Sequence, residues 1–165
     1  MTTVPTTLQG ILPWTRSCFV CGEDNPHGLH LRPRIENGRI IIDYVPRTAD
    51  LGYKHIVHGG IAVTLLDEVM TWAAIVASRH VCVAAELTSR LKRSILVGQV
   101  LRVEGGVTRQ TSRLILTEGV ILDSSGQPVQ TATGKYMPMP KDQIDLTQKD
   151  FVVSPHTIQP GQIVE

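Results

Sequence analysis

The sequence has little net charge, few cysteines and no leader-like start. Its 16 basic and 15 acidic residues give a formal net charge of +1, so it lacks the positive field that attracts nucleic acid or an anionic membrane surface. Three cysteines, an odd number, argue against a disulfide framework. Residues 1–7 do not resemble a secretory signal, and no apolar run approaches the length of a membrane-spanning helix. These absences predict a cytoplasmic protein with no nucleic-acid or membrane partner.

What is present fits one globular domain. The 165 residues are 42% hydrophobic and 19% charged, which is ordinary for a soluble protein with a sizeable core. No internal repeat is visible. We expect a lead-in over residues 1–17, a domain over residues 18–140 and a polar C-terminal extension over residues 141–165.

The chain is organised around residues 58–74, which we expect to form one long helix. No Lys or Arg occurs between Lys54 and Arg79, so the helix has no ordinary solvated face. Apolar residues recur at helical spacing, namely Ala62, Leu65, Leu66, Val69, Ala73 and Val76. The polar residues gather on the other side, namely Thr64, Asp67, Glu68 and Thr71. A buried carboxylate is costly without a partner, so the two acids call for a reason.

The start of this helix reads His58-Gly59-Gly60. The first turn of a helix offers free N–H groups and a partial positive charge, which suit an oxyanion or a polarised carbonyl. The glycine pair taken alone is explained equally well by tight packing or a turn. Asp67 follows His58 by nine positions, about 13 Å along a helix. If both groups serve one reacting atom, the second must come from another copy of the chain, as a two-fold dimer provides.

Strand patterns flank the helix on both sides. Residues 28–34 and 39–45 are expected to pair through a hairpin at Glu36-Asn37-Gly38, since Asn-Gly is a strong turn signal. Four more strands are expected over residues 81–89, 100–107, 112–122 and 127–137. One buried helix with about six antiparallel strands predicts an α+β fold whose sheet curls over the helix.

Cys18-Phe19-Val20-Cys21-Gly22 invites a zinc interpretation, with His27 and His30 nearby. The histidine spacing is not that of a zinc finger, and no second Cys-x-x-Cys follows. We therefore predict a compact turn with small buried thiols, no metal and no cofactor.

Residues 53–68, which include His58-Gly59-Gly60 and Asp67-Glu68, resemble the His-Gly-Gly…Asp-Glu signature of hotdog-fold acyl-CoA thioesterases of the PaaI-like type. Residues 18–29 and 132–137 resemble the lead-in and the last strand of many members, so the likeness covers about residues 18–139. The resemblance implies a curved sheet wrapped around one helix, homodimers that often pair into tetramers, and hydrolysis of acyl-CoA.

The resemblance also implies roles for individual residues. The amide of Gly59 or Gly60 would polarise the thioester carbonyl, His58 would orient the thioester, and Asp67 would be the base or nucleophile. Glu68 lies about 100° further round the helix and is the weaker candidate for the acid, with a salt bridge as its ordinary role. Glu68 and Thr71 are retained as candidate substrate contacts.

Two stretches depart from the family pattern. Many members have Gly where this chain has His55. Many also have Thr-Ala-Asn-Leu after the helix, where this chain has Ala84-Ala85-Glu86-Leu87. Thr71 or Thr88 could supply the missing hydroxyl, and Glu86 could be a second carboxylate near the interface.

Phosphates of coenzyme A require cations. Arg90, Lys92 and Arg93 cluster after the strand that follows the helix, and Arg109 and Arg113 flank a later turn.

Two alternatives to the hydrolase stay open. One is a hotdog dehydratase or hydratase, although the positions just after Asp67 lack the expected His. The other is a non-hydrolytic acyl-CoA-binding protein. A purely structural dimer would leave the acids without a task.

Overall fold

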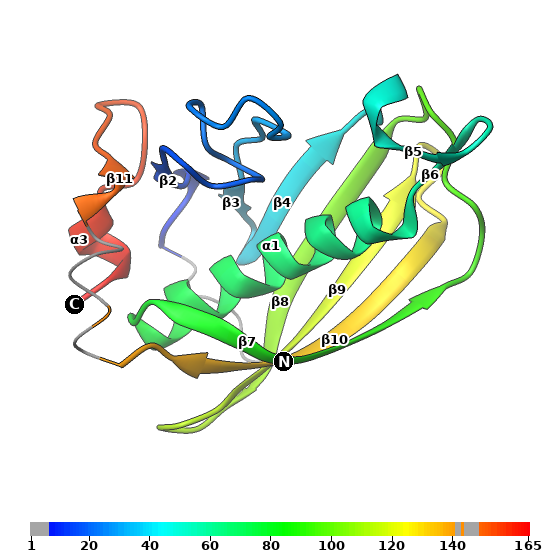
Figure 1. Cartoon of the computed structure of the whole chain (residues 1–165). Coiled ribbons are helices and arrows are strands. Elements are labelled where there is room, and N and C mark those ends of the chain that lie inside the picture. Colours follow the sequence, from blue (N-terminus) through cyan, green and yellow to red (C-terminus); the bar gives the residue numbers. More distant parts are fainter. Residues whose placement is uncertain (1–6, 141–142, 144–148) are drawn as a thin grey trace.

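The protein is described by a computed structural model that covers residues 7–140, 143 and 149–165. A seven-stranded antiparallel sheet curves around one long helix, α1 (Gly59–Ser78) (Figure 1). The sheet order is β1 (Gly10–Ile11), β3 (Arg34–Glu36), β4 (Arg39–Tyr44), β8 (Leu101–Gln110), β9 (Ile115–Asp123), β10 (Pro128–Pro138) and β7 (Cys82–Leu91). This arrangement confirms the predicted α+β hotdog fold, with seven strands in place of about six.

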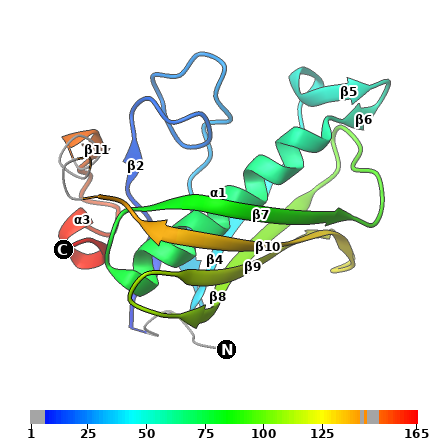
Figure 2. The same ribbon diagram turned by 60° about the horizontal axis from the view of Figure 1, so that its bottom comes forward.

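The remaining elements are short. β5 (Leu51–Tyr53) and β6 (Ile56–Val57) form a small ribbon before α1, preceded by a 3-10 turn, η1 (Thr48–Asp50). β2 (Trp14–Thr15) pairs with β11 (Phe151–Val152), and α3 (Pro160–Ile163) follows. Segments from both ends of the chain thus lie side by side (Figures 1 and 2). The boundaries at residues 17 and 140 stay predictions.

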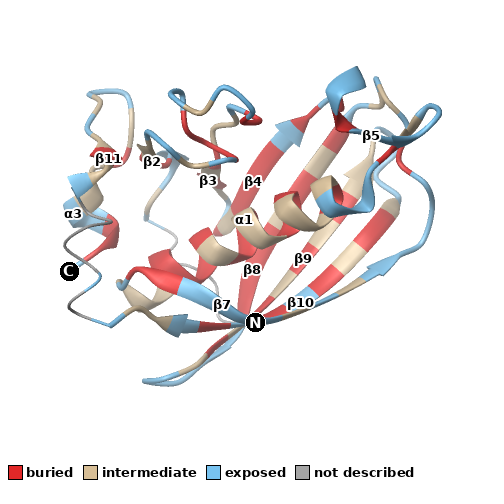
Figure 3. Cartoon of the chain, in the orientation of Figure 1, coloured by how far each residue is buried: buried red, intermediate tan, exposed pale blue. Residues whose placement is uncertain are grey.

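α1 is the centre of the core. Its apolar face packs against β8, β9, β10 and β4 (Figures 2 and 3). Contact is closest where β8 and β9 carry glycine. A Cβ atom at Gly105 would lie 2.7 Å from the backbone of Val69, and one at Gly119 would lie 3.0 Å from Leu66. By length and composition alone α1 would reach across a membrane, which corrects the expectation that no run is long enough. Its burial against the sheet accounts for that apolarity.

Strand boundaries agree with the predictions after the helix and over residues 39–45, but not over residues 28–34. The expected strand over residues 28–34 is wrong, because only Arg34–Glu36 pairs in the sheet and His30 has a positive φ of 56°. The hairpin is confirmed. Asn37 and Gly38 have φ values of 51° and 72°, the left-handed pair that a two-residue hairpin turn needs.

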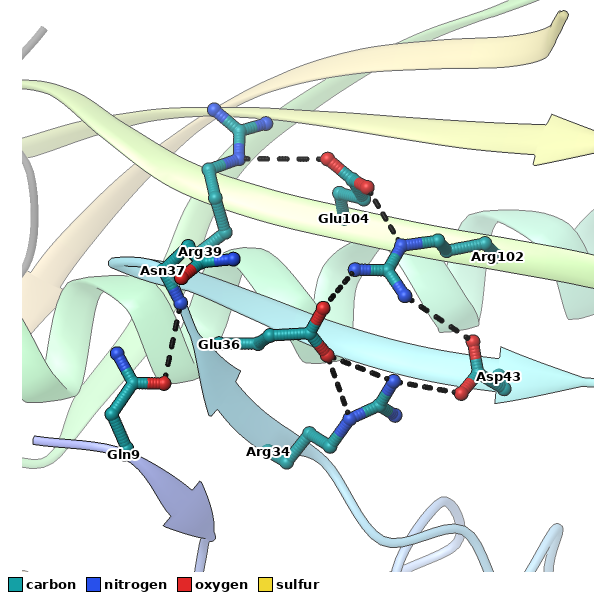
Figure 4. A network of polar contacts seen from close by, with 8 residues as sticks. All are labelled: Gln9, Arg34, Glu36, Asn37, Arg39, Asp43, Arg102 and Glu104. Atoms are coloured by element: carbon teal, nitrogen blue, oxygen red, sulfur yellow. Dashed lines mark hydrogen bonds and ion pairs between the residues drawn. The ribbon is translucent and has the colours of Figure 1, made fainter. Parts of the chain in front are cut away.

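The sheet face away from α1 carries a network of alternating charges (Figure 4). Arg102 bonds to Glu36 and to Glu104, each at 2.8 Å, and Arg34 pairs with Asp43 at 2.8 Å. Ile41 alternates with these residues on β4 and is buried on the same face. The network therefore covers apolar surface on the outside of the sheet.

β7 is an edge strand, and no other described segment pairs with its outer side. It is ten residues long, and most of its residues are exposed, Val83 and Leu91 among them (Figure 3). A long unpaired edge is a template for pairing with another strand.

Candidate active site at the start and middle of the central helix

His58 caps the start of α1. Its ring Nδ1 accepts the N–H of Gly60 at 2.9 Å, and its carbonyl oxygen accepts the N–H of Ile61 at 3.0 Å. The amide of Gly59 has no acceptor among the described residues, and a Cβ atom at this position would meet nothing within 4 Å. Of the two predicted donors, only Gly59 is therefore free to face a ligand.

A buried carboxylate holds this helix start in place. The backbone N–H of His58 donates to the carbonyl of Asp50 at 2.8 Å. The Asp50 side chain is 2% exposed and accepts from the Arg47 guanidinium at 2.9 Å, from the Arg47 amide at 2.6 Å and from the Tyr44 hydroxyl. Burial raises the pKa of Asp50, but the hydrogen bonds from Arg47 and Tyr44 outweigh it, so the net pKa lies below the ordinary value. The segment before α1 is thus anchored by an ionised acid.

A cavity of about 420 Å³ opens at this helix start, a size typical of small-ligand sites. Its lining includes His58, Gly59, Ala62, Ile95 and Gln130. Gln130 is 3% exposed, and its Oε1 has no hydrogen-bond partner among the described residues. A second cavity of similar volume lies by Arg39, Thr88 and Glu118, and no residue of α1 lines it.

Asp67 lies in the middle of α1 and is half-buried. The Tyr136 hydroxyl, from β10, donates to Asp67 Oδ1 at 2.7 Å, and Thr71 Oγ1 lies 3.5 Å from the same oxygen. Tyr136 is fully buried, and Gly134 makes room for it, since a Cβ atom there would lie 2.5 Å from the Tyr136 ring. A phenol and a threonine therefore orient the predicted acid.

The position of Ala84 relates the hydroxyl missing from β7 to the Tyr136 hydroxyl. It lies directly opposite Tyr136 in the β7–β10 register, so the position that lacks the family hydroxyl has a phenol across from it. Thr88 lines the cavity by Arg39, which no residue of α1 lines, whereas Thr71 lies 3.5 Å from Asp67 Oδ1. Glu86 pairs with Lys135 at 2.8 Å. His55 adopts a φ of 65°, which accounts for glycine at this position in the family pattern.

Glu68 points to a different place from Asp67. Its Oε1 accepts the indole N–H of Trp72 at 3.0 Å, and its carboxylate lies within 4.8 Å of the thiols of Cys18 and Cys21. Burial and the nearby Cys18 raise the pKa of Glu68 to about 8. Within the described part of one protomer Glu68 forms no ion pair, so it makes no salt bridge to a loop there, and a salt bridge across an interface stays a prediction.

The candidate phosphate ligands divide into separate groups. The amides of Lys92 and Arg93 both bond to Val129, and the Arg93 side chain pairs with Asp123 at 2.9 Å. Arg90 lines the cavity by Arg39. Lys92 and Arg93 immediately precede Ser94 and Ile95 of the helix-start cavity, whereas Arg109 lies at the other end of the β8–β9 hairpin.

Sequence reasoning missed the roles of Tyr136 and Gln130. Both belong to the inward-facing set of β10, where buried residues alternate with exposed ones. A polar side chain at an inward position of a strand is the signal that could have found them. What the sequence could not supply is the pairing of Tyr136 with Asp67, 69 residues away.

Comparisons with known proteins agree with this fold. Residues 54–130 match the family model of the thioesterase superfamily. No curated protein matches the sequence significantly. Among solved structures, a thioesterase superfamily protein superposes with a TM-score of 0.67 at 24% identity, over 74% of this chain and 60% of that one. This chain thus spans less than two thirds of that protein.

Two further solved structures are similar to this chain. The E. coli PaaI protein from the phenylacetic acid degradation operon has a TM-score of 0.59 at 19% identity, over 62% of this chain and 73% of its own. A Streptococcus mutans protein bound to acetyl-CoA has a TM-score of 0.57 at 20% identity, over 65% of this chain and 86% of its own. At these identities the likeness establishes the shared fold.

Proposed function

We propose that the chain, whose residues 54–130 match the family model of the thioesterase superfamily, is an acyl-CoA thioesterase. The observation that carries the proposal is the Gly59 amide at the start of α1, which has no acceptor in the described part of the chain and borders a cavity of about 420 Å³. Thioester hydrolysis needs a donor to the developing oxyanion and a group that takes a proton from water. Coenzyme A as the carrier is supported by the acetyl-CoA bound to one structural neighbour.

His58 and Gly59 would act together on the carbonyl. Because Nδ1 of His58 accepts the Gly60 amide, the neutral ring carries its proton on Nε2. That N–H has no partner among the described residues and can donate to the bound thioester. The Gly59 amide then donates to the carbonyl oxygen as negative charge develops there.

Asp67 would act at the reacting carbon. It either takes the proton of the attacking water or attacks the carbonyl itself. In both cases the C–S bond breaks, and CoA leaves as a thiolate that takes up a proton. In the second case water then hydrolyses the acyl–Asp67 anhydride, which releases the free acid and restores the carboxylate. Tyr136 and Thr71 hold the carboxylate in position.

One protomer does not complete this site. Gly59 and Asp67 are eight residues apart on one straight helix, about 12 Å along its axis. A two-fold dimer would bring the Gly59 of one protomer to the Asp67 of its partner. The unpaired edge of β7 supports pairing of the two sheets.

The test is thiol release from acyl-CoAs of increasing length and from aromatic acyl-CoAs. Asp67→Asn is expected to lose most turnover, with Asp43→Asn on the far sheet face as the matched control. Gly59→Pro deletes the amide donor at a helix position that tolerates proline, and the His58 backbone, with φ −60° and ψ 130°, suits a following proline. Gly59→Ala keeps the amide and is its control.

Mixing the two inactive variants tests the shared site. Random reassociation gives half heterodimers, each with one intact site, so about a quarter of wild-type activity returns. No recovery, in mixtures shown to exchange subunits, would contradict the shared site. Undiminished hydrolysis by Asp67→Asn would refute the assignment of the acid. Tight acyl-CoA binding without hydrolysis of any substrate would favour the binding-protein alternative.

A further inference from the structure

Cys18, Cys21 and Glu68 form a cluster that the proposed thioesterase chemistry does not use. One ligand-type atom from each lies within 4.8 Å of the others, and Cys21 is buried. The turn brings the two thiols together, and the fold adds a carboxylate from the middle of α1, 47 positions after Cys21 in the sequence. The sequence alone offered a cysteine pair with unsuitable histidines. The third ligand-type group was not visible in it.

The turn is built to hold a thiolate. The amides of Val20 and Cys21 both donate to Cys18 Sγ at 3.3 Å, and the amide of Gly22 donates to the Cys18 carbonyl at 2.9 Å. Gly22 is required here, since any Cβ atom would overlap the backbone of Arg16 and Cys18. Backbone N–H groups directed at sulfur stabilise the ionised form that binds metals.

From this geometry we propose that Cys18, Cys21 and Glu68 bind a zinc ion that fastens the 18–22 turn to α1. Two thiolates select a soft or borderline metal over magnesium or calcium. In a tetrahedral site, bonds of about 2.3 Å to sulfur and about 2.1 Å to oxygen place ligand atoms about 3.5–3.8 Å apart. Separations of at most 4.8 Å therefore need only small side-chain shifts.

The charges also fit. Two thiolates and one carboxylate carry three negative charges, which a divalent cation largely offsets, and a buried carboxylate without such a partner is costly. Three protein ligands leave a fourth position for water. His30 is not that ligand, because its Nε2 bonds to the Asn25 carbonyl at 2.6 Å. Glu68 also keeps the Trp72 indole bond, an outer contact of the kind that orients metal ligands.

The role of the ion would be structural. Trp72 contacts Phe151 of β11, with ring centroids 6.1 Å apart. The cluster therefore lies where the N-terminal turn, α1 and the C-terminal strand pair meet. Asp67 is the neighbouring residue on α1 but faces Tyr136. The inference does not depend on thioesterase activity, and its test needs no substrate.

The experiment measures metal content and cobalt absorption of the full chain, purified under reducing conditions without chelator after growth with added zinc. We expect about one zinc ion per chain in the wild type, and on cobalt substitution an intense sulfur-to-cobalt charge-transfer band. Cys18→Ser and Cys21→Ser should each lose the stoichiometric zinc. Glu68→Gln should weaken zinc binding by about tenfold or more. Cys82→Ser is the matched control, because Cys82 is a buried thiol outside the cluster.

Several results would overturn the proposal. The first is that the reduced wild-type protein takes up neither zinc nor cobalt. The second is that Cys82→Ser loses as much zinc as the variants of Cys18 and Cys21. The third is that Glu68→Gln binds zinc with unchanged affinity. An intact mass lower by two hydrogens before reduction, with no metal bound after reduction, would identify a redox-active cysteine pair instead. If a cysteine variant fails to fold, the cobalt spectrum of the wild type still decides whether thiolates bind the ion.

Discussion

Removing the Tyr136 hydroxyl tests how much the orientation of Asp67 matters. Tyr136→Phe keeps the ring, which fits the space above Gly134, and deletes only the donor that lies 2.7 Å from Asp67 Oδ1. A hydrogen bond to a charged group contributes about 1.5–3 kcal/mol. Because Asp67 is half-buried and Thr71 stays within 3.5 Å, water and Thr71 would replace part of it. We take the net loss as about 1–2 kcal/mol.

That loss corresponds to a fall in kcat of roughly 5- to 30-fold, at about 1.4 kcal/mol per factor of ten. The assay is thiol release with kcat and KM determined separately, and KM should stay within about twofold. A thermal scan should show a decrease in Tm of a few degrees, at about 2–4 °C per kcal/mol for a chain of this size.

The double variant of Tyr136 and Asp67 is the sharper test. If Tyr136 acts by positioning Asp67, Tyr136→Phe should have almost no further effect on the residual rate of Asp67→Asn. Tyr44→Phe is the control, since it removes a buried hydroxyl that serves Asp50 instead, and its effect should multiply with that of Asp67→Asn. An unchanged kcat in Tyr136→Phe, or the same proportional loss in both backgrounds, would refute the positioning role.

Two further predictions concern stability. Gly105→Ala should lower the free energy of unfolding by about 1–3 kcal/mol, because its Cβ would lie 2.7 Å from the Val69 backbone. Gly161→Ala has open space around it and should leave the urea midpoint nearly unchanged. Equal midpoints for the two variants would show that α1 can move aside. Asp50→Asn should destabilise the folded protein at pH 7. Because the pKa of Asp50 is lowered in the fold, the stabilisation from this carboxylate is present above its unfolded-state pKa of about 4 and is lost as the pH falls through its folded-state pKa. Thermal unfolding at pH 7 and at pH 3 should therefore show a smaller gap between variant and wild type at pH 3, and a gap that grows on acidification would contradict the sign.

Local sequence patterns predicted most of the fold. The absence of Lys and Arg in α1 and the period-two alternation of β8, β9 and β10 gave elements whose centres agree with the structure. The error over residues 28–34 has a physical cause. The amides of Leu29 and Leu31 donate to the carbonyls of Phe19 and Val20, each at 2.8 Å, so this segment is held in the 18–33 loop instead of the sheet. Strands of two residues, such as β1 and β2, are too short to show any periodicity.

The candidate site was predictable only where its members are close in sequence. His58, Gly59 and Asp67 lie on one helix, so spacing relates them. Tyr136 reaches Asp67 from β10, which follows α1 in the chain, and Cys18 reaches Glu68 from the N-terminal turn, which precedes α1. Contacts of this kind depend on register and on curvature of the sheet, which no local pattern encodes.

α1 therefore serves two neighbouring clusters with adjacent residues. Asp67 and Glu68 are about 100° apart around the helix, so one carboxylate faces Tyr136 on the sheet and the other faces the cysteine turn. A helix loosened on the turn side would also move Asp67, because both acids share one rigid backbone. The proposed zinc site would therefore affect catalysis without contacting substrate, because it would fix the position of α1, and so of Asp67, on the side that the sheet leaves uncovered.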